Sequence, residues 1–244
     1  PGSGFDVVIN ASASSLHVDW DDPLRADRYR VWLLIVGTDT DFGHAGPTGI
    51  VPIDGVTSVL VADGATAGVL SADQATAAYR AADGSVRRAA GGSSTPIDDR
   101  AGLVAPGLDA YGWTWSGGLG AALGAFDAEG VSSGLVASSI PADAAVVAIA
   151  VSRDATRIAV GLASASGPRL LVFGIVRSGG TPTALDPPLE LPIADGIASV
   201  AWVDDRSLVV VTEPAVGRAV RVVGLGAPGE SLGAIPAGGV AVGG

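Results

Sequence analysis

The chain has 244 residues, of which 48% are hydrophobic, so it is long enough to bury a substantial core. Its 14 basic residues are all arginine, and 25 acidic residues bring the formal net charge to −11, which disfavours nucleic acid and anionic membrane surfaces as partners, because both require clustered positive charge. The chain has no cysteine, which excludes disulfides, thiolate nucleophiles and cysteine-based metal sites.

The first 53 residues predict short strands. Apolar segments occur at 5–9, 16–20, 29–36 and 49–53, and turn-forming residues separate them. We interpret residues 1–53 as an atypical first copy of a four-stranded unit, and residues 54–244 as four clearer copies.

From residue 61 onward, a strand–turn–strand pattern with an aspartate in the turn recurs. The turn aspartates are Asp63, Asp109, Asp154 and Asp205, at spacings of 46, 45 and 51 residues. In the last two copies a further hairpin follows, and each copy closes on a short strand that ends in proline, Leu189–Pro192 and Leu232–Pro236. A helix-compatible pattern occurs only at Asp73–Arg80, and it is too short to support an α/β fold.

A period of about 45 residues with four short strands is typical of a β-propeller blade. Non-alternating apolar runs such as Val146–Val151 indicate strands that are buried on both faces. Small residues are expected where first strands crowd the propeller axis, and Ala148, Ala150, Ala198 and Ala201 meet that need. The sequence therefore predicts one all-β domain over residues 1–244, a β-propeller of about five blades. A β-sandwich of this length would not impose such a repeat.

Several of these segments resemble the propeller domain of the actinobacterial LpqB lipoproteins. They are Ala150–Asp154 with Arg157–Val160, Arg169–Val172, Ser199–Trp202 with Leu208–Val210, and Gly112–Ser116. The resemblance covers about residues 50–244, and its motifs are structural.

This resemblance implies a lipoprotein held on the outer face of the cell membrane by an N-terminal lipidated cysteine. It also implies a spore-germination-type (GerMN) domain ahead of the propeller and a role in the Mtr two-component system, where the family is thought to bind the extracytoplasmic part of the sensor histidine kinase. The sequence begins without Met or a basic leader, so we interpret it as a piece of a longer product. Its longest apolar run, Ala144–Val151, is too short to span a bilayer.

Three glycine-rich motifs match catalytic or cofactor-binding patterns only in spacing. Gly130–Gly134 has the nucleophile-elbow spacing, but both histidines precede it and no helix is predicted after it. Gly224–Gly229 matches the dinucleotide fingerprint, yet Pro228 and a short strand follow where a helix is required. Gly118, Gly120 and Gly124 fail for a related reason, because Phe126–Val131 is predicted to form another hairpin where a helix would be required. We interpret all three as turns.

Metal-binding patterns are also weak. Asp39–Gly43 lacks the third carboxylate and the bidentate glutamate of a calcium loop, and Asp19, Asp21 and Asp22 are interpreted as solvated turn residues. The two histidines, His17 and His44, are too few for a typical imidazole site. Asn10–Ser12 is a glycosylation sequon without meaning in a bacterial protein. We therefore assign no catalytic, cofactor-binding or metal-binding residue, and expect no cofactor.

Two functional hypotheses remain. The first is a non-enzymatic interaction module that presents loops to a protein partner, with the inserts Gly37–Gly49, Arg88–Gly102 and Arg177–Pro188 as candidate contact sites. The alternative is a propeller that binds or hydrolyses cell-envelope glycans or small ligands. Clustered carboxylates and an aromatic residue at one mouth of the central channel would favour the alternative. A channel lined by alanine, glycine and backbone, with an exposed apolar patch, would favour the first. The low aromatic content, 5%, disfavours sugar stacking, and Trp113 and Trp115 are expected to pack in the core.

Overall fold

In the computed structural model, only the backbone of the strands before Ala65 is described, whereas most residues between Ala65 and Gly226 are described with their side chains. The described residues are 5–10, 15–20, 32–35, 47–52, 59–63, 65, 67–71, 75–120, 123–135, 137–202, 205–213, 219–226 and 231–236. Side chains of 70, 219, 220 and 231–236 are not described. The chain divides into two compact units, Pro1–Gly64 and Ala65–Gly244. All regular structure in the described ranges is β-strand, so no membrane-spanning helix occurs there.

The first unit contains two small antiparallel sheets. In one, β1 (Phe5–Asn10) pairs with β2 (Ser15–Trp20). In the other, β4 (Pro47–Pro52) lies between β3 (Trp32–Ile35) and β5 (Val59–Asp63). The sequence predicted strands in these places. Whether residues 1–53 form a blade of their own stays a prediction.

The second unit contains four consecutive antiparallel sheets, each built from neighbouring strands in chain order. The first sheet has β6 (Ala67–Leu70), β7 (Thr76–Arg80), β8 (Val86–Ala90) and β9 (Ser93–Asp98). The second has β10 (Leu103–Leu108), β11 (Thr114–Gly118) and β12 (Leu123–Phe126). The third has β13 (Ala145–Val151), β14 (Arg157–Ala163), β15 (Arg169–Ser178), β16 (Thr181–Leu185) and β17 (Leu189–Leu191). The fourth has β18 (Gly196–Trp202), β19 (Ser207–Glu213), β20 (Ala219–Gly224) and β21 (Ser231–Pro236).

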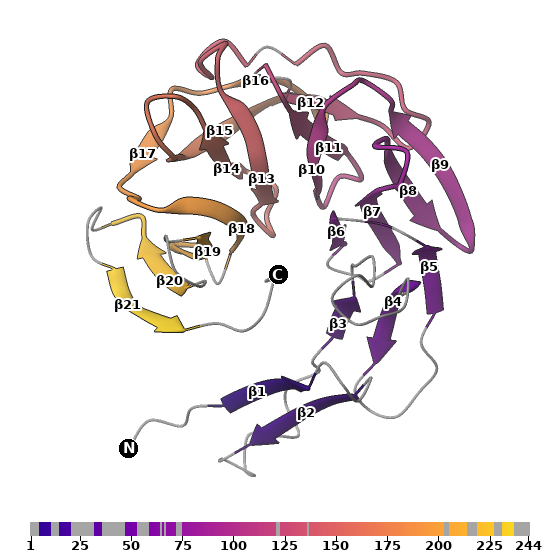
Figure 1. The fold of residues 1–244 in the computed structure, drawn as a ribbon. Coiled ribbons are helices and arrows are strands. Elements are labelled where there is room, and N and C mark those ends of the chain that lie inside the picture. Colours follow the sequence, from indigo (N-terminus) through magenta and orange to yellow (C-terminus); the bar gives the residue numbers. More distant parts are fainter. Residues whose placement is uncertain are drawn as a thin grey trace. The chain divides into compact units, whose positions relative to one another are not determined.

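The four sheets of the second unit stack side by side through their first strands. β6 contacts β10, β10 contacts β13, and β13 contacts β18, as Figure 1 shows for the purple-to-yellow part of the chain. Each first strand is an edge strand, because the described ladders pair it only with the second strand of its own sheet. This is the arrangement of propeller blades, in which each four-stranded sheet covers its neighbours.

Two hydrophobic clusters fill the spaces on either side of the third sheet. One contains Trp115 and Ala125 of the second sheet with Ile158, Val160 and Phe173 of the third. The other packs Ala159, Leu170 and Val172 of the third sheet against Val200 and Leu208 of the fourth. The third sheet is therefore buried on both faces, as its uninterrupted apolar runs predicted. Trp115 is fully buried and Trp113 packs on the same cluster, which confirms their predicted core role.

Glycine allows the second and third sheets to approach closely. A Cβ atom added to Gly117 would lie 2.4 Å from Cγ1 of Val146, and one added to Gly107 would lie 2.7 Å from Cγ2 of Ile149. Real Cβ contacts are not that short, so any larger residue would push the two sheets apart.

Three sequence interpretations need correction. Asp63 ends β5 in the first unit, so the first turn of sheet β6–β9 lies instead at Ser71–Thr76. The helix-compatible segment Asp73–Arg80 contains strand β7, because its alanines face neighbouring strands. Arg88–Gly102 is no insert: its main part is the regular hairpin of β8 and β9.

Candidate functional site

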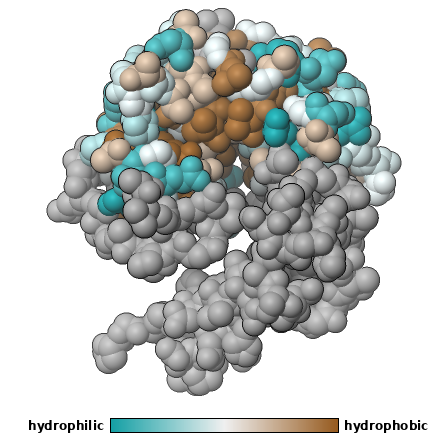
Figure 2. Space-filling view, viewed as in Figure 1, coloured by the Kyte–Doolittle hydropathy of each residue, from teal (hydrophilic) through white to brown (hydrophobic). Residues whose placement is uncertain are grey.

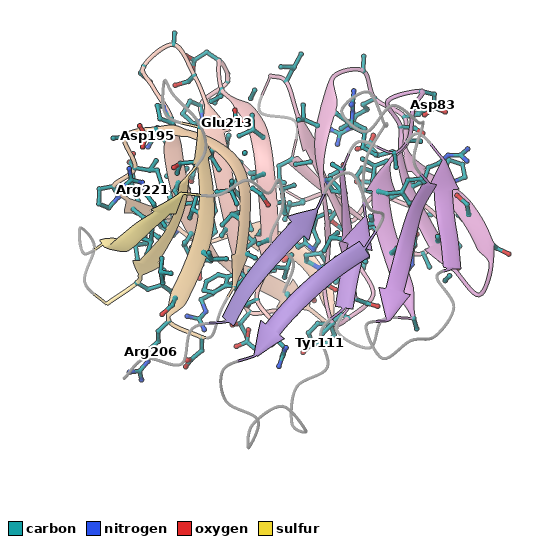
Figure 3. The ribbon with its side chains drawn as sticks, turned by 60° about the horizontal axis from the view of Figure 1, so that its bottom comes forward. Asp83, Tyr111, Asp195, Arg206, Glu213 and Arg221 are labelled. Atoms are coloured by element: carbon teal, nitrogen blue, oxygen red, sulfur yellow. The ribbon has the colours of Figure 1, made fainter. Side chains whose placement is uncertain are left out.

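The turns that join first to second strands gather at one end of the second unit, which we call the turn face. They are Ser71–Thr76, Asp109–Trp113, Ser152–Arg157 and the segment between β18 and β19. Side-chain contacts join neighbouring turns, because Arg157 reaches the Asp205 carbonyl and Arg177 spans Asp109 and Ala155. Figure 3 shows Tyr111 and Arg206 at this end, and Asp83, Asp195 and Glu213 at the opposite end.

Serine closes two of these turns in the same way. The Ser152 N–H donates to the Arg157 carbonyl, and the Arg157 N–H donates back to the Ser152 hydroxyl oxygen. The hydroxyl hydrogen is shared between that carbonyl and Asp154, and the three Ser152–Arg157 distances are 2.9–3.1 Å. Ser71 and Thr76 repeat all three hydrogen bonds. The Ser152 hydroxyl also lies 2.6 Å from Asp154 Oδ1, and this hydrogen bond holds the pKa of the Asp154 carboxyl below its ordinary value. Asp154 is therefore a turn residue, as predicted.

Aspartate closes the turn after β10 and the turn after β12. Asp109 Oδ1 accepts hydrogen bonds from the backbone N–H groups of Tyr111 and Trp113, both at 2.9 Å. Asp127 does the same for Glu129 and Val131. The two turns share the sequence Asp-Ala-X-Gly, and Gly112 and Gly130 both adopt positive φ, a conformation that glycine takes without steric cost.

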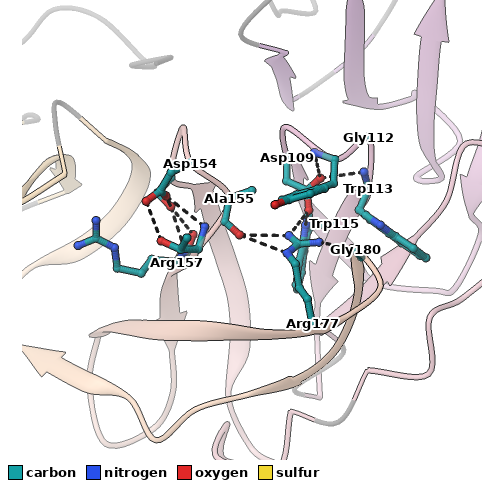
Figure 4. Close-up of polar contacts among 12 residues, drawn as sticks. Asp109, Gly112, Trp113, Trp115, Asp154, Ala155, Arg157, Arg177 and Gly180 are labelled. Atoms are coloured by element: carbon teal, nitrogen blue, oxygen red, sulfur yellow. Dashed lines mark hydrogen bonds and ion pairs between the residues drawn. The ribbon is translucent and has the colours of Figure 1, made fainter.

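The second carboxylate oxygen of Asp109 links the second and third sheets. Asp109 Oδ2 lies 2.6 Å from a guanidinium nitrogen of Arg177 at the end of β15, and it also accepts from the Trp115 indole at 3.1 Å. Arg177 further donates to the Ala155 and Gly180 carbonyls (Figure 4). Its guanidinium also stacks on the Tyr111 ring. The Asp109 side chain is 0% exposed and that of Arg177 is 12% exposed, so this is a buried ion pair with a nearly complete set of partners.

Other arginines bridge the remaining joints. Arg80 and Arg88 of the first sheet donate to the Leu103 and Gly112 carbonyls of the second. Arg157 of the third sheet donates to the Asp205 carbonyl of the fourth at 2.6 Å, and its guanidinium lies over the Trp202 ring. A guanidinium presents five donors in a planar fork and stacks on aromatic rings, which a lysine ammonium does not. The exclusive use of arginine is consistent with these multidentate bridges.

A second buried carboxylate joins the first and second sheets. Asp98, at the end of β9, receives hydrogen bonds from the Arg100 guanidinium at 2.6–3.1 Å and from the Ser116 hydroxyl. Burial alone would raise the pKa of Asp98, but these hydrogen bonds outweigh it and hold the pKa below its ordinary value. Asp98 is therefore ionised and structural at neutral pH.

The turn face also carries exposed hydrophobic side chains. Tyr111 is 60% exposed, Val131 62% and Val176 41%. Val176 belongs to a hairpin in which β16 pairs with the C-terminal half of β15. The N-terminal half of β15 pairs with β17, which is the regular fourth strand of the third sheet. The predicted insert Arg177–Pro188 is thus a structured hairpin, rooted by Arg177.

A cavity of about 470 Å³ is lined by the first strands β6, β10, β13 and β18 and opens toward the turns. Its walls are mostly alanine, glycine, valine and backbone, and the predicted small residues Ala148, Ala150, Ala198 and Ala201 are among them. In Figure 2 hydrophobic residues gather toward the middle of the described part, and hydrophilic ones lie along its outer margin.

The turn end of this cavity also holds Asp109, Asp154, Asp205 and Trp202. The structure thus places carboxylates and an aromatic residue where a glycan-directed site would have them. Asp109 and Asp154 are, however, saturated by their own turns and Arg177, and the Trp202 ring carries the Arg157 guanidinium at 5.2 Å. A general acid needs a raised pKa, whereas that of Asp154 is lowered.

The glycine-rich motifs that were interpreted as turns lie in hairpins, as far as the structure describes them. Gly130–Gly134 follows the Asp127 turn, and Ser132 bridges back to Phe126. Gly118 and Gly124 belong to β11 and β12, and Gly224 ends β20, after which strand β21 follows. His44, Asp39–Gly43, and the side chains of Asn10, His17 and Asp19 lie outside the described residues. In the described part no group of three or more histidine or acidic residues is arranged to hold a metal ion.

The family model of the lipoprotein LpqB beta-propeller domain matches residues 44–243. The chain belongs to this family. Its fold is accordingly an all-β propeller, as the sequence predicted, while the number of blades stays a prediction.

One solved structure supports this fold, and a second match is weaker. TolB from Acinetobacter baumannii matches with a TM-score of 0.54 at 12% identity, over 75% of this chain and 47% of that one. The WD40 repeats of RRP9 match with a TM-score of 0.47 at 15% identity, over 65% and 47% of the two chains. The chain thus spans about half the length of each. No curated protein matches.

In this LpqB propeller domain, sequence reasoning found the turn aspartates Asp109 and Asp154 and the small residues of the cavity wall. It missed Tyr111 and the bridging role of Arg177. The repeated Asp-Ala-X-Gly string at Asp109 and Asp127 was the available signal for the paired turns.

Proposed function

We propose that this LpqB propeller domain is a non-catalytic, extracytoplasmic interaction module that binds the extracytoplasmic domain of a sensor histidine kinase and tunes its signalling. Family membership supports this role. In this proposal a lipid anchor holds the full protein at the outer face of the cell membrane. Residues 1–244 act as a single propeller domain.

The observation that carries the proposal is the turn face. Tyr111, Val131 and Val176 are exposed hydrophobic residues on short turns and an added hairpin. The buried Arg177–Asp109 bridge fixes the turn of Tyr111 and the hairpin of Val176, and Asp127 closes the turn of Val131. Tyrosine, arginine and exposed hydrophobic side chains on a rigid support are typical of protein interfaces. Because the structure holds the loops in place before binding, little conformational entropy is lost on association.

The glycan alternative is less well supported. Hydrolysis would require two carboxylates, one of them protonated near neutral pH, but the rim carboxylates Asp109 and Asp154 are bound within the protein. We therefore favour protein binding without catalysis.

The test is a calorimetric titration of the domain with the purified extracytoplasmic domain of the cognate sensor kinase. The double variant Val131→Arg/Val176→Arg should abolish or strongly weaken saturable binding. Leu119→Arg is the matched control, because Leu119 is 62% exposed but follows β11 at the opposite end. Equal weakening by both variants, or no binding by the folded domain, would contradict the proposal.

A further inference from the structure

The cavity wall consists of strand edges rather than of strand faces. Its lining includes every residue from Val104 to Ala110 and from Val147 to Asp154, and all of Ala198–Trp202. A strand face would contribute only alternate residues, because successive side chains point to opposite sides. Runs of consecutive residues therefore mean that the unpaired backbone edges of β10, β13 and β18 line the cavity.

These edges carry hydrogen-bonding groups that the described ladders leave unpaired. Buried backbone N–H and C=O groups are almost always satisfied by protein, water or ligand. The Ala150 carbonyl of β13 accepts a hydrogen bond from the Trp202 indole of β18 at 3.0 Å, so a side chain of the neighbouring sheet reaches the backbone of this strand.

Three neighbouring first strands contain a β-bulge at the same place. The register skips Val104 between Leu103 and Ala105 in β10, Val147 between Val146 and Ala148 in β13, and Ala198 between Ile197 and Ser199 in β18. All three skipped residues are half-buried and line the cavity. Bulges re-aim side chains and are frequent beside binding sites, and here they place small apolar residues at one level of the wall.

The end of the cavity at the turn face, away from the bulges, is polar, but its positive and negative charges nearly cancel. Arg153 and Arg157 accompany Asp154 and Asp205, while Asp109 is neutralised by Arg177. No strongly charged ligand is favoured there. Trp202 is the only aromatic residue lining the described wall, and Arg157 covers its ring, so a sugar has no free stacking surface.

We propose that this cavity is a binding site for a short, extended peptide segment rich in small residues, recognised through its backbone. Such a peptide presents alternating N–H and C=O groups that complement one strand edge, which is the chemistry of strand addition. About five residues span roughly 17 Å, comparable to the length of one first strand. The cavity volume of about 470 Å³ lies within the range of ligand-binding pockets. This site is separate from the hydrophobic residues of the turn face.

The test uses acetyl-Ala-Ser-Ala-Ser-Ala-amide and the same peptide N-methylated at alternate residues, titrated into the 244-residue chain by calorimetry. Methylation removes donors but keeps the side chains. We expect saturable binding of the first peptide and at least about tenfold weaker binding of the second, because methylation at alternate residues removes more than one hydrogen bond to the strand edge. Equal binding of the two, or no binding of either, would overturn the proposal. Binding of chitotetraose without binding of the peptide would do so as well.

Variants locate the site. Val147→Trp should fill the cavity at the level of the bulges and weaken peptide binding at least about tenfold, the free-energy equivalent of about 1.4 kcal/mol. Leu119→Trp, at a position that is 62% exposed and does not line the cavity, is the matched control and should leave peptide binding unchanged. Ala198→Phe is a second filling variant that keeps the test decisive if Val147→Trp does not fold. Undiminished binding by a folded filling variant contradicts the assignment.

Discussion

The buried pair of Asp109 and Arg177 should contribute more to stability than any exposed ion pair of the domain. Arg177→Met keeps most of the aliphatic stem but removes the guanidinium, so Asp109 loses its charged partner while its side chain stays 0% exposed. The Ala155 and Gly180 carbonyls lose their donor in the same substitution.

Breaking a buried ion pair by removing one partner typically costs about 3–5 kcal/mol, because the remaining charge is buried without compensation. Here Asp109 retains the Trp115 indole and two backbone N–H donors, so we expect about 3 kcal/mol, at the lower end of that range. For a domain of this size that corresponds to a fall in Tm of about 6–12 °C.

Arg169→Met provides the control. Arg169 binds Glu190 through two short hydrogen bonds, at 2.8 and 2.7 Å, but the side chains are 30% and 52% exposed. Exposed pairs contribute about 0–1 kcal/mol. Urea unfolding followed by circular dichroism measures both variants. Losses of equal size would refute the argument that burial of the Asp109–Arg177 pair sets its energetic importance.

Further predictions concern packing and pH. Gly117→Ala should destabilise the domain by about 1–3 kcal/mol through overpacking against Val146. Gly224→Ala should be neutral or slightly stabilising, because no atom lies within 4 Å of its added Cβ. Thermal melts compare the two variants, and equal effects would contradict the argument that the sheets approach closely at Gly117. The pKa values of Asp98 and Asp154 lie below their ordinary 3.8, so their stabilising effect is complete above that pH and is lost as the pH falls through the lowered values. Urea midpoints at pH 7 and pH 3 should show this decline. Asp98→Asn should make it shallower, and an unchanged pH dependence in this variant would contradict the role of Asp98.

The strands of the third and fourth sheets could be predicted from the sequence because their apolar runs are bounded by clear turn residues. All residues of Ala144–Val151 and Leu208–Val210 are buried or half-buried, so no exposed polar face interrupts the apolar pattern. The first sheet was harder. Val61–Gly64 resembles the start of a repeat locally, yet the corresponding turn is closed by Ser71 rather than by an aspartate.

The bridges between sheets could not be predicted from local pattern. Arg177 lies 68 residues from Asp109 along the chain, and Arg157 lies 48 residues from Asp205. Their pairing depends on how neighbouring sheets stack. The bulges at Val104, Val147 and Ala198 were also hidden, because a one-residue register shift leaves no signal in an apolar run.

The most direct test of the proposed function is site-specific photo-crosslinking in the full-length lipoprotein on cell membranes. A photoreactive phenylalanine analogue replaces Tyr111 on the turn face in one strain and Leu119 at the opposite end in another. Our account predicts a crosslink to the sensor kinase from position 111 and none from position 119. A crosslink from position 119 alone, or from neither position in a folded and correctly anchored protein, would contradict it.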